Sequence, residues 1–295
     1  MEIGTPAHLH LRLNQLLIEK EGAEAASIPI EDLGVLIIDE PSVTCSHRVL
    51  AACCKENVAV IFSDERHLPG GILLSLNGNT LQSRVIADQV NAGEPLKKRL
   101  WQQIVREKIR GQARTLKAVT GDAGPLLGMV ELVGSGDPDN VEGRAARLYW
   151  PLLFGDSFRR DHTLPGRNAL LNYGYAIMRA AVARAIVGSG LHPSLGLHHH
   201  NQYDAFCLAD DLMEPLRPIV DLKVARLTVE CGDNIELGKE VKAKMLGLLN
   251  LLCNIGRQRL PLMVAMHSYT ASLAQAFGEG EHRLDIPIWD AKTVE

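Results

Sequence analysis

The sequence lacks three features that would indicate a membrane protein or a secreted, disulfide-bonded protein. It has no stretch of about 18 consecutive apolar residues, so we expect no transmembrane helix and no membrane partner. Residues 1–6 have neither a basic start nor an apolar core, so a signal peptide is not expected. The six cysteines lie at positions 45, 53, 54, 207, 231 and 253, without a Cys-x-x-Cys pair. We therefore predict a cytoplasmic protein with reduced, mostly buried thiols.

A net positive charge is also missing, so the overall charge does not by itself indicate a nucleic-acid partner. The formal net charge is −4, from 31 Lys and Arg against 35 Asp and Glu. Residues 97–184, however, hold 15 Lys and Arg against 8 Asp and Glu, a surplus of +7 that leaves −11 for the rest. A basic middle section in an acidic protein favours binding to phosphate, although solvated helices have similar charge patterns.

Residues 1–76 have the pattern of a β-rich unit. Short apolar or alternating runs predict strands over 8–13, 15–20, 35–39 and 58–62. Residues 46–56 predict one short helix, for which Ser42 or Ser46 is the candidate cap. Pro69-Gly70-Gly71 and Asn77-Gly78-Asn79 predict turns.

Residues 77–295 have mainly helical spacing. The predicted helical segments are 80–90, 96–119, 168–187, 208–214, 221–229 and 239–255, and residues 278–295 are expected to be polar and irregular. We therefore predict an α+β protein, with a small β-rich domain over 1–76 followed by a larger all-α domain over 77–295.

The segment 96–119 predicts a strongly basic helix. Leu96, Leu100, Ile104 and Ile109 can form an apolar stripe. The cationic residues expected on its other sides are Lys97, Lys98, Arg99, Arg106, Lys108, Arg110, Arg114 and Lys117. This pattern is typical of a solvated helix face or of a surface that follows the DNA backbone.

The stretch 196–218 combines three histidines, His198 to His200, with the acidic residues Asp211 and Glu214. On a helix Asp211 and Glu214 project from one face, and Pro215 limits how far that helix continues. Imidazole and carboxylate donors without a thiolate suit Mn²⁺ or Mg²⁺ better than a structural zinc ion. The alternatives are a surface histidine loop and an ordinary solvated helix face.

A second acidic position, Glu142, lies at the start of a predicted helix, with Asp137-Pro138 as a plausible N-cap and first helical residue. Arg144 and Arg147 follow it at a spacing of three. Glu142 is either a first-turn glutamate favoured by the helix dipole or a metal ligand beside phosphate-binding arginines. With the histidine stretch, it supplies the donors that metal-assisted phosphodiester chemistry requires.

A basic loop follows at 158–166. Arg159 and Arg160 lie in this loop and Arg167 comes directly after it. All three are candidates for phosphate contacts, although arginines in loops are as often simply exposed.

Four blocks of the sequence together resemble a known family, the CRISPR-associated integrases of spacer acquisition (the Cas-one family). The blocks are Val141-Glu142-Gly143 to Trp150, Arg167-Asn168-Ala169 to Ala176, Gly190-Leu191 to His199, and Leu208-Ala209 to Asp221. They occur in the family's order and extend the resemblance over nearly the whole chain. The histidine triplet and the length are most similar to the variants from type II CRISPR systems.

The resemblance implies a fold and a site. It implies an N-terminal β-sandwich-like domain for dimerisation and partner docking, followed by a helical catalytic domain. It implies Glu142, His199 and Glu214 as catalytic metal ligands, with Asp211 as a secondary acidic residue. The Gly196-x-x-His199 motif selects His199, while His198 and His200 stay open, as does the choice between Asp211 and Glu214. Arg217 is expected to hold these carboxylates or to contact a phosphate.

The resemblance also implies an activity and partners. The expected reaction is joining of the 3′-hydroxyl ends of foreign double-stranded DNA fragments to CRISPR repeat DNA by transesterification, with Mg²⁺ or Mn²⁺. The expected assembly is a homodimer, with two dimers bridged by a dimer of the Cas-two family protein in a heterohexamer. The type II effector nuclease is a further candidate partner.

Three other functions fit parts of the sequence. A di-iron carboxylate protein would need two Glu-x-x-His motifs, and only Glu279 to His282 fits. A non-catalytic DNA-binding scaffold and a metal-dependent repair nuclease acting on branched DNA are the stronger alternatives.

Overall fold

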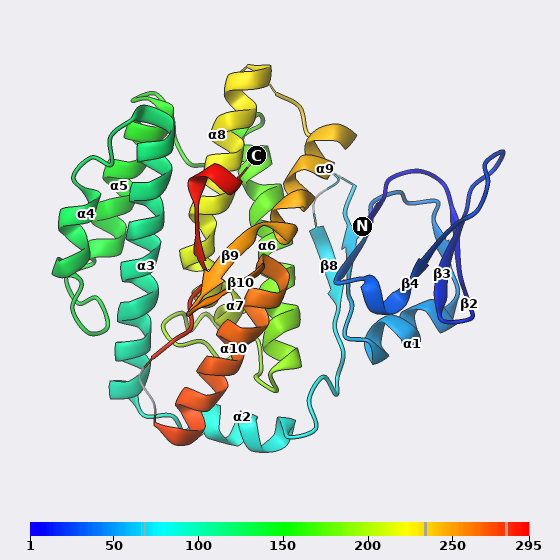
Figure 1. The fold of residues 1–295 in the computed structure, drawn as a ribbon, viewed down its shortest axis with the longest axis horizontal. Helices are drawn as coiled ribbons and strands as arrows, with labels where there is room; N and C mark the ends of the chain where they lie inside the picture. Colours follow the sequence, from blue (N-terminus) through cyan, green and yellow to red (C-terminus); the bar gives the residue numbers. More distant parts are fainter. Residues whose placement is uncertain (66, 68, 233–234, 281–282, 295) are drawn as a thin grey trace.

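The protein combines a small β-rich unit with a larger helical body (Figure 1). A computed structural model describes residues 1–65, 67, 69–232, 235–280 and 283–294. In these residues the predicted α+β class is confirmed, whereas the boundary predicted at residue 76 stays a prediction. None of the helices in these ranges is both long enough and apolar enough to cross a membrane.

Two four-stranded sheets form the N-terminal unit. The first has the order β1 (Glu2–Ile3), β5 (Val35–Ile38), β7 (Ala59–Ser63), β8 (Pro69–Leu73), and the second has β4 (Ala26–Pro29), β3 (Gln15–Glu19), β2 (His8–Arg12), β6 (Thr44–Cys45). A short helix, α1 (His47–Lys55), and the 3₁₀ turn η1 (Ile30–Asp32) accompany them. The predicted strands over 8–13, 15–20, 35–39 and 58–62 are confirmed as β2, β3, β5 and β7, and the predicted short helix as α1.

The first sheet is buried on both faces. Leu36 and Val60 face the core of the N-terminal unit, while Ile37 and Ile61 face the core of the helical body. Successive strand residues point to opposite faces, so burial of both faces requires continuous apolar runs rather than alternation. The prediction of a turn at Pro69 to Gly71 is wrong, because these residues begin β8. This strand lies at the sheet edge, where proline is tolerated.

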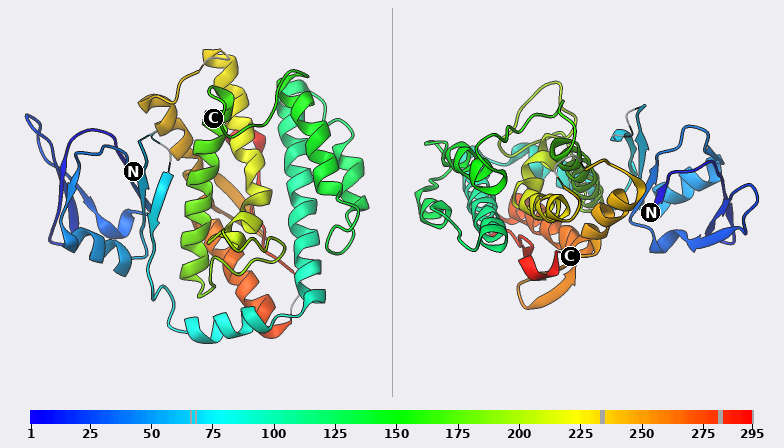
Figure 2. Two further views of the ribbon diagram at one scale, coloured as in Figure 1. Left: turned by 180° about the vertical axis from the view of Figure 1, so that it is seen from behind. Right: turned by 90° about the horizontal axis from the view of Figure 1, so that it is seen from above.

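The helical body is built around long helices in contact with one another (Figures 1 and 2). Its helices are α2 (Gln82–Asn91), α3 (Glu94–Thr120), α4 (Leu126–Met129), α5 (Val141–Phe154), α6 (Arg167–Gly188), α7 (Cys207–Met213), α8 (Arg217–Cys231), α9 (Lys239–Leu246) and α10 (Leu262–Glu279). Short 3₁₀ segments are η2 (Val130–Leu132), η3 (Glu214–Leu216), η4 (Gly247–Asn250) and η5 (Ala291–Thr293). Helix α3 packs on α5 and α8, and α6 packs on α7, α8 and α10.

The all-α prediction for residues 77–295 is wrong in its last part. Strands β9 (Leu252–Ile255), β10 (Gln258–Pro261) and β11 (Ile288–Trp289) form an antiparallel sheet, so the helix predicted over 239–255 ends at Leu246. Burial alternates along β9, which is the period of a strand. Gly256, with φ 56°, allows the tight turn into β10. The irregular tail predicted over 278–295 also contains β11, while residues 281, 282 and 295 lie outside the described residues.

Helix α3 runs through the core instead of along the surface. Lys108, Gln112 and Thr115 are buried in it. Arg110 and Arg114 are bound to Glu107 on the same helix, at 3.5 and 2.6 Å. The predicted basic surface is therefore reduced, and its exposed cations are Lys98, Arg99 and Lys117.

Candidate active site

The first turn of α5 fixes the position of Glu142. Asn140, in the left-handed region with φ 47°, is the N-cap, and its Oδ1 accepts from the Gly143 N–H at 3.1 Å. The Asp137 carboxylate accepts from the N–H groups of Val141 and Glu142, at 2.9 and 3.0 Å. Asp137 thus caps the helix from a turn upstream, and the predicted start at Pro138 is corrected to Val141. These bonds satisfy N–H groups that a helix leaves unpaired at its start.

A single buried carboxylate shapes the loop that carries the histidines. Asp211 of α7 is fully buried, and its Oδ2 accepts from the N–H groups of Leu197 and His198 at 2.7 and 2.9 Å. Its Oδ1 lies 2.5 Å from Nδ1 of His199. This hydrogen bond raises the pKa of His199 against the opposing effect of burial. Because Asp211 engages Nδ1, the other ring nitrogen, Nε2, is the one left for a ligand.

Glu214 lies where the chain passes from α7 through η3 into α8. It is buried, and the Nε of Arg217 donates to its Oε1 at 2.8 Å. Burial alone would raise the pKa of Glu214, but the cations of Arg217 and Lys108 outweigh burial and lower it to about 2. Glu214 is therefore ionised at neutral pH despite its burial.

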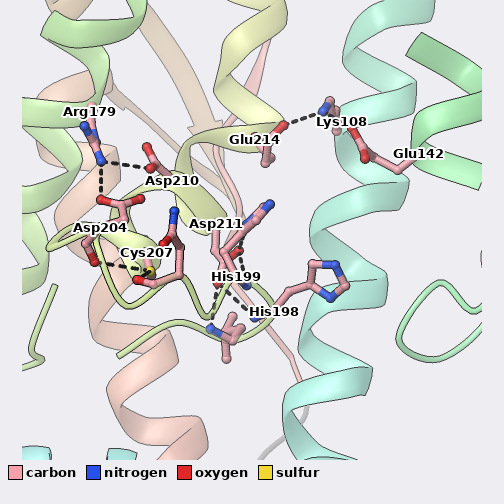
Figure 3. Close-up of polar contacts among 12 residues, drawn as sticks. Lys108, Glu142, Arg179, His198, His199, Asp204, Cys207, Asp210, Asp211 and Glu214 are labelled. Carbon is pink, nitrogen blue, oxygen red and sulfur yellow. Dashed lines mark hydrogen bonds and ion pairs between the residues drawn. The ribbon is translucent and has the colours of Figure 1, made fainter. Parts of the chain in front are cut away.

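Lys108 brings the two glutamates together. Its Nζ contacts Oε1 of Glu142 and Oε2 of Glu214, so side chains from α3, α5 and η3 meet at one point (Figure 3). His199 and Asp211 lie beside this cluster in the same view. The sequence pattern predicts Lys108 on the polar side of helix α3. The signal that could have found it is the spacing of four from Leu100 through Ile104, which puts Lys108 on the apolar stripe.

The other two histidines take different positions. The ring of His198 stacks on Trp101 of α3, with centroids 4.3 Å apart and planes 1° apart. His200 is exposed. Trp101, which the sequence did not suggest, therefore anchors the loop on the side of α3 and leaves His199 to face the glutamates.

The donor chemistry of this cluster fits a hard divalent cation. Two carboxylates and one imidazole match the ligands of Mg²⁺ or Mn²⁺. In the described residues no three acidic, histidine or cysteine side chains are already arranged around one metal position. Lys108 contacts both glutamates. Within the described part of the chain, the hydrogen bonds of Asp211 all go to the histidine loop, whereas Glu214 meets Glu142 at Lys108.

The arginines predicted to bind DNA fall into two groups. Arg144 and Arg147 are exposed on α5, and neither side chain has a hydrogen bond or ion pair within the described residues. Arg159 is exposed but donates to the carbonyls of Asp156 and Phe158. The inward group is Arg160, bound to Asn168 and Asn172; Arg167, bound to the carbonyl of Phe154; and Arg217, bound to Glu214. The inward arginines hold the scaffold, and a DNA contact for any of the six stays a prediction.

A buried polar network supports Arg217 from behind. The hydroxyls of Tyr149 and Tyr175 both donate to Asp221, the former at 2.9 Å. The guanidinium of Arg217 lies 4.7 Å from the centre of the Tyr175 ring. Burial raises the pKa of Asp221 to about 6, although the tyrosine hydroxyls oppose that shift. The network fixes the Arg217 side chain that in turn fixes Glu214.

Comparison with known proteins shows the family of this chain. The family model described as CRISPR associated protein Cas1 matches residues 3–131 and 139–230. A CRISPR-associated endonuclease Cas1 from Neisseria meningitidis is 38% identical over 266 residues, covering 90% of this chain and 87% of the relative.

Two solved structures have the same fold. A casposase bound to integration product has a TM-score of 0.77 at 21% identity, covering 100% of this chain and 95% of that one. A Cas6-RT-Cas1–Cas2 complex has a TM-score of 0.76 at 19% identity, covering 98% of this chain and 36% of that one. The family match spans most of the chain, and it includes the segments that carry Glu142, His199 and Glu214. The chain belongs to the CRISPR-associated Cas1 family, the Cas-one family that its motifs resemble.

Proposed function

We propose that this protein is a metal-dependent integrase of CRISPR adaptation, which joins 3′-hydroxyl ends of DNA fragments into the repeat array by transesterification. The observation that carries the proposal is the meeting of Glu142 and Glu214 at one point beside His199, in a member of the Cas1 family. The naming of a relative as an endonuclease and of a structural neighbour as a casposase bound to integration product supports this class of chemistry.

Glu142, His199 and Glu214 would hold Mg²⁺ or Mn²⁺. When bound, such an ion polarises a phosphate and helps to position or deprotonate an attacking hydroxyl. The chain's own contribution is orientation: Asp211 fixes the ring of His199, and Arg217 fixes the carboxylate of Glu214. The DNA 3′-hydroxyl would attack phosphorus in the repeat strand and the 3′-hydroxyl of that strand would leave, so no protein nucleophile is required. Water in its place would give nuclease activity.

DNA and a Cas2 protein are the proposed partners. The exposed Arg144 and Arg147 lie within two turns of Glu142, where cations can neutralise DNA phosphates. Structural neighbours include a Cas6-RT-Cas1–Cas2 complex and a Cas1–DNA complex. We propose a homodimer, with two dimers bridged by a Cas2 dimer, acting on double-stranded DNA fragments and CRISPR repeat DNA. The type II effector nuclease is a proposed additional partner.

A strand-transfer assay tests the function. The purified protein is mixed with a short duplex bearing free 3′ ends and a plasmid bearing a repeat array, with Mn²⁺ or Mg²⁺, with and without the Cas2 partner. We expect metal-dependent joining that is lost in Glu142→Ala and His199→Ala, while Glu24→Ala, which removes an exposed glutamate of the N-terminal unit, keeps it. Cleavage of branched DNA that needs neither repeat nor partner would instead favour the repair nuclease. DNA binding without joining under either metal would indicate the scaffold.

A further inference from the structure

Lys108 is a buried cation between the two glutamates of the active site. Its side chain is 10% exposed, and its Nζ contacts Oε1 of Glu142 and Oε2 of Glu214 (Figure 3). A lysine is rarely buried to this extent unless it is paired, because its charge must leave water. The two carboxylates supply this pairing, one from α5 and one from η3.

The contacts of the two glutamates show which oxygens the lysine uses. Arg217 already takes Oε1 of Glu214, at 2.8 Å, so Lys108 takes the other oxygen of that carboxylate. The same ammonium contacts Oε1 of Glu142, and it is drawn between the two glutamates in Figure 3. Lys108 therefore occupies the position where the two glutamates face each other.

A metal ion bound by the same glutamates would require this position. Two cations a few ångströms apart in a partly buried site repel each other, and lysine is a compact charge on a flexible four-carbon stem. The ammonium can therefore swing out of the position while its stem stays on α3. Arg217 has no such freedom, since the Tyr175 ring lies under its guanidinium and Glu214 holds its Nε.

We infer that Lys108 is an internal counter-ion, which holds Glu142 and Glu214 together in the metal-free protein and is displaced when Mg²⁺ or Mn²⁺ binds between them. This inference rests on the proposed metal site. It predicts that the site is preorganised without metal and that metal binding must first displace the ammonium. If the ammonium occupies the position in about nine tenths of the molecules, the apparent Kd for the metal is raised about tenfold.

The test measures metal binding rather than integration. Mn²⁺ is titrated calorimetrically into wild type, Lys108→Met, Lys108→Gln, Lys98→Gln and Glu142→Ala, and each protein is melted in EDTA and in Mn²⁺. Lys98→Gln is the matched control, since it removes an exposed cation from the same helix. We expect the two Lys108 variants to bind Mn²⁺ about tenfold more tightly, with the control unchanged. We also expect a lower melting temperature in EDTA and a larger rise with Mn²⁺ than wild type shows.

The outcomes separate this inference from the proposed function. In one outcome, both Lys108 variants bind Mn²⁺ no more tightly than wild type, and Glu142→Ala does not bind it. This result would overturn the counter-ion role and leave the integrase site intact. No Mn²⁺ binding by wild type or by either variant would overturn both. If Lys108→Met does not fold in EDTA, the Mn²⁺ affinity of Lys108→Gln decides the test. Folding of either variant only in the presence of Mn²⁺ would also support the inference.

Discussion

At the scale of single residues, the active site depends on buried charges whose partners are distant in the sequence. Asp211 has no exposed surface, and its carboxylate takes hydrogen bonds from the backbone and the ring of the histidine loop. Through these bonds it fixes the position of His199. Asp211 is therefore the residue whose conservative replacement tests how His199 is positioned.

Asp211→Asn replaces one acceptor oxygen by an NH₂ group that faces N–H donors. We expect the unfolding free energy to fall by about 2–4 kcal/mol, because hydrogen bonds to a buried charge are lost and N–H groups are left unpaired. We expect Mn²⁺ binding to weaken by about 10–100-fold, the usual effect of losing the partner that orients a ligand. Urea unfolding and calorimetry measure the two effects. Asp32→Asn, at an exposed position, is the control; equal values in both variants would contradict this role.

Asp210 adds a pH-dependent contribution to the same region. Burial, aided by the neighbouring Asp204 carboxyl, raises the pKa of Asp210 from about 3.8 to about 6. Arg179 of α6 binds both carboxylates, at 2.6 and 2.9 Å. With a raised folded-state pKa, the stabilising contribution is complete below pH 3.8 and is lost as the pH rises through about 6.

Asp210→Asn should remove that dependence. We expect the unfolding free energy of wild type to decline relative to the variant between pH 4 and pH 7, because only wild type has to ionise this group. Urea unfolding at several pH values measures the difference. A difference that stays constant over this range, or grows in favour of wild type, would contradict the assignment.

The residues that the sequence predicts as metal ligands differ from those that it does not indicate in how they are connected along the chain. Glu142, His199 and Glu214 lie in continuous motifs, so each was identified from its neighbours in the chain. Lys108 and Trp101 contact the site from helix α3. Lys108 precedes Glu142 by more than thirty residues in the sequence, and Trp101 precedes His198 by more than ninety. Their roles follow from how α3 packs in the core. The periodicity of apolar residues describes each helix separately, so it does not predict how the helices pack together.

At the scale of elements, the segment between α6 and α7 is shaped by close packing as well as by hydrogen bonds. A Cβ added at Gly196 would overlap the carbonyl oxygen of His199 and lie 3.0 Å from Oδ2 of Asp211. Backbone atoms cannot move aside as a flexible side chain can. The glycine in the Gly196-x-x-His199 motif is therefore required by the turn that presents the histidine.

Gly196→Ala should consequently displace His199. We expect a loss of about 1–3 kcal/mol in unfolding free energy, typical of overpacking, and strand transfer at least tenfold slower. Gly128→Ala in α4 is the matched control, because nothing lies within 4 Å of the added Cβ. Activity in Gly196→Ala equal to that of the control would show that the turn tolerates a side chain.

Helices and strands were predictable where the apolar residues follow a single period, either that of a helix or that of a strand. The helices over 80–90, 96–119 and 168–187 appear as α2, α3 and α6, and the buried strands of the N-terminal unit appear as predicted. The prediction failed over 239–255, where the helical α9 runs through a short η4 into β9. A short apolar run is compatible with the period of a helix or of a strand. The pairing of β9 with β10 and β11 makes this run a strand.

At the scale of the whole molecule, buried ion pairs tie the N-terminal unit to the helical body. Lys242 of α9 binds Asp39 at 2.6 Å and Glu2 at 3.6 Å, and the Tyr173 hydroxyl of α6 donates to Glu2 at 3.3 Å. Glu2, Asp39 and Lys242 also border a pocket of about 710 Å³ between the two parts. The relative position of the two parts therefore depends on a few charges as well as on apolar packing.

Lys242→Met removes the lysine cation from the buried carboxylate of Asp39 and the partly buried carboxylate of Glu2. We expect the unfolding free energy to fall by about 3–5 kcal/mol, as found when one partner of a buried pair is removed. Lys244→Met, on the same helix but with a more exposed side chain, should leave the unfolding free energy nearly unchanged, because exposed ion pairs contribute little. Thermal or urea unfolding distinguishes the two. Similar small losses in both variants would show that apolar packing alone joins the parts.

The central claim is that Glu142, His199 and Glu214 hold one divalent cation at the point where α5, the histidine loop and η3 meet. A crystal grown with Mn²⁺ and measured for anomalous scattering tests it directly. We expect a peak about 2.0–2.3 Å from oxygen atoms of both glutamates and from Nε2 of His199, with the Lys108 ammonium withdrawn. A peak elsewhere, or none with Lys108 still between the glutamates at saturating Mn²⁺, would contradict it.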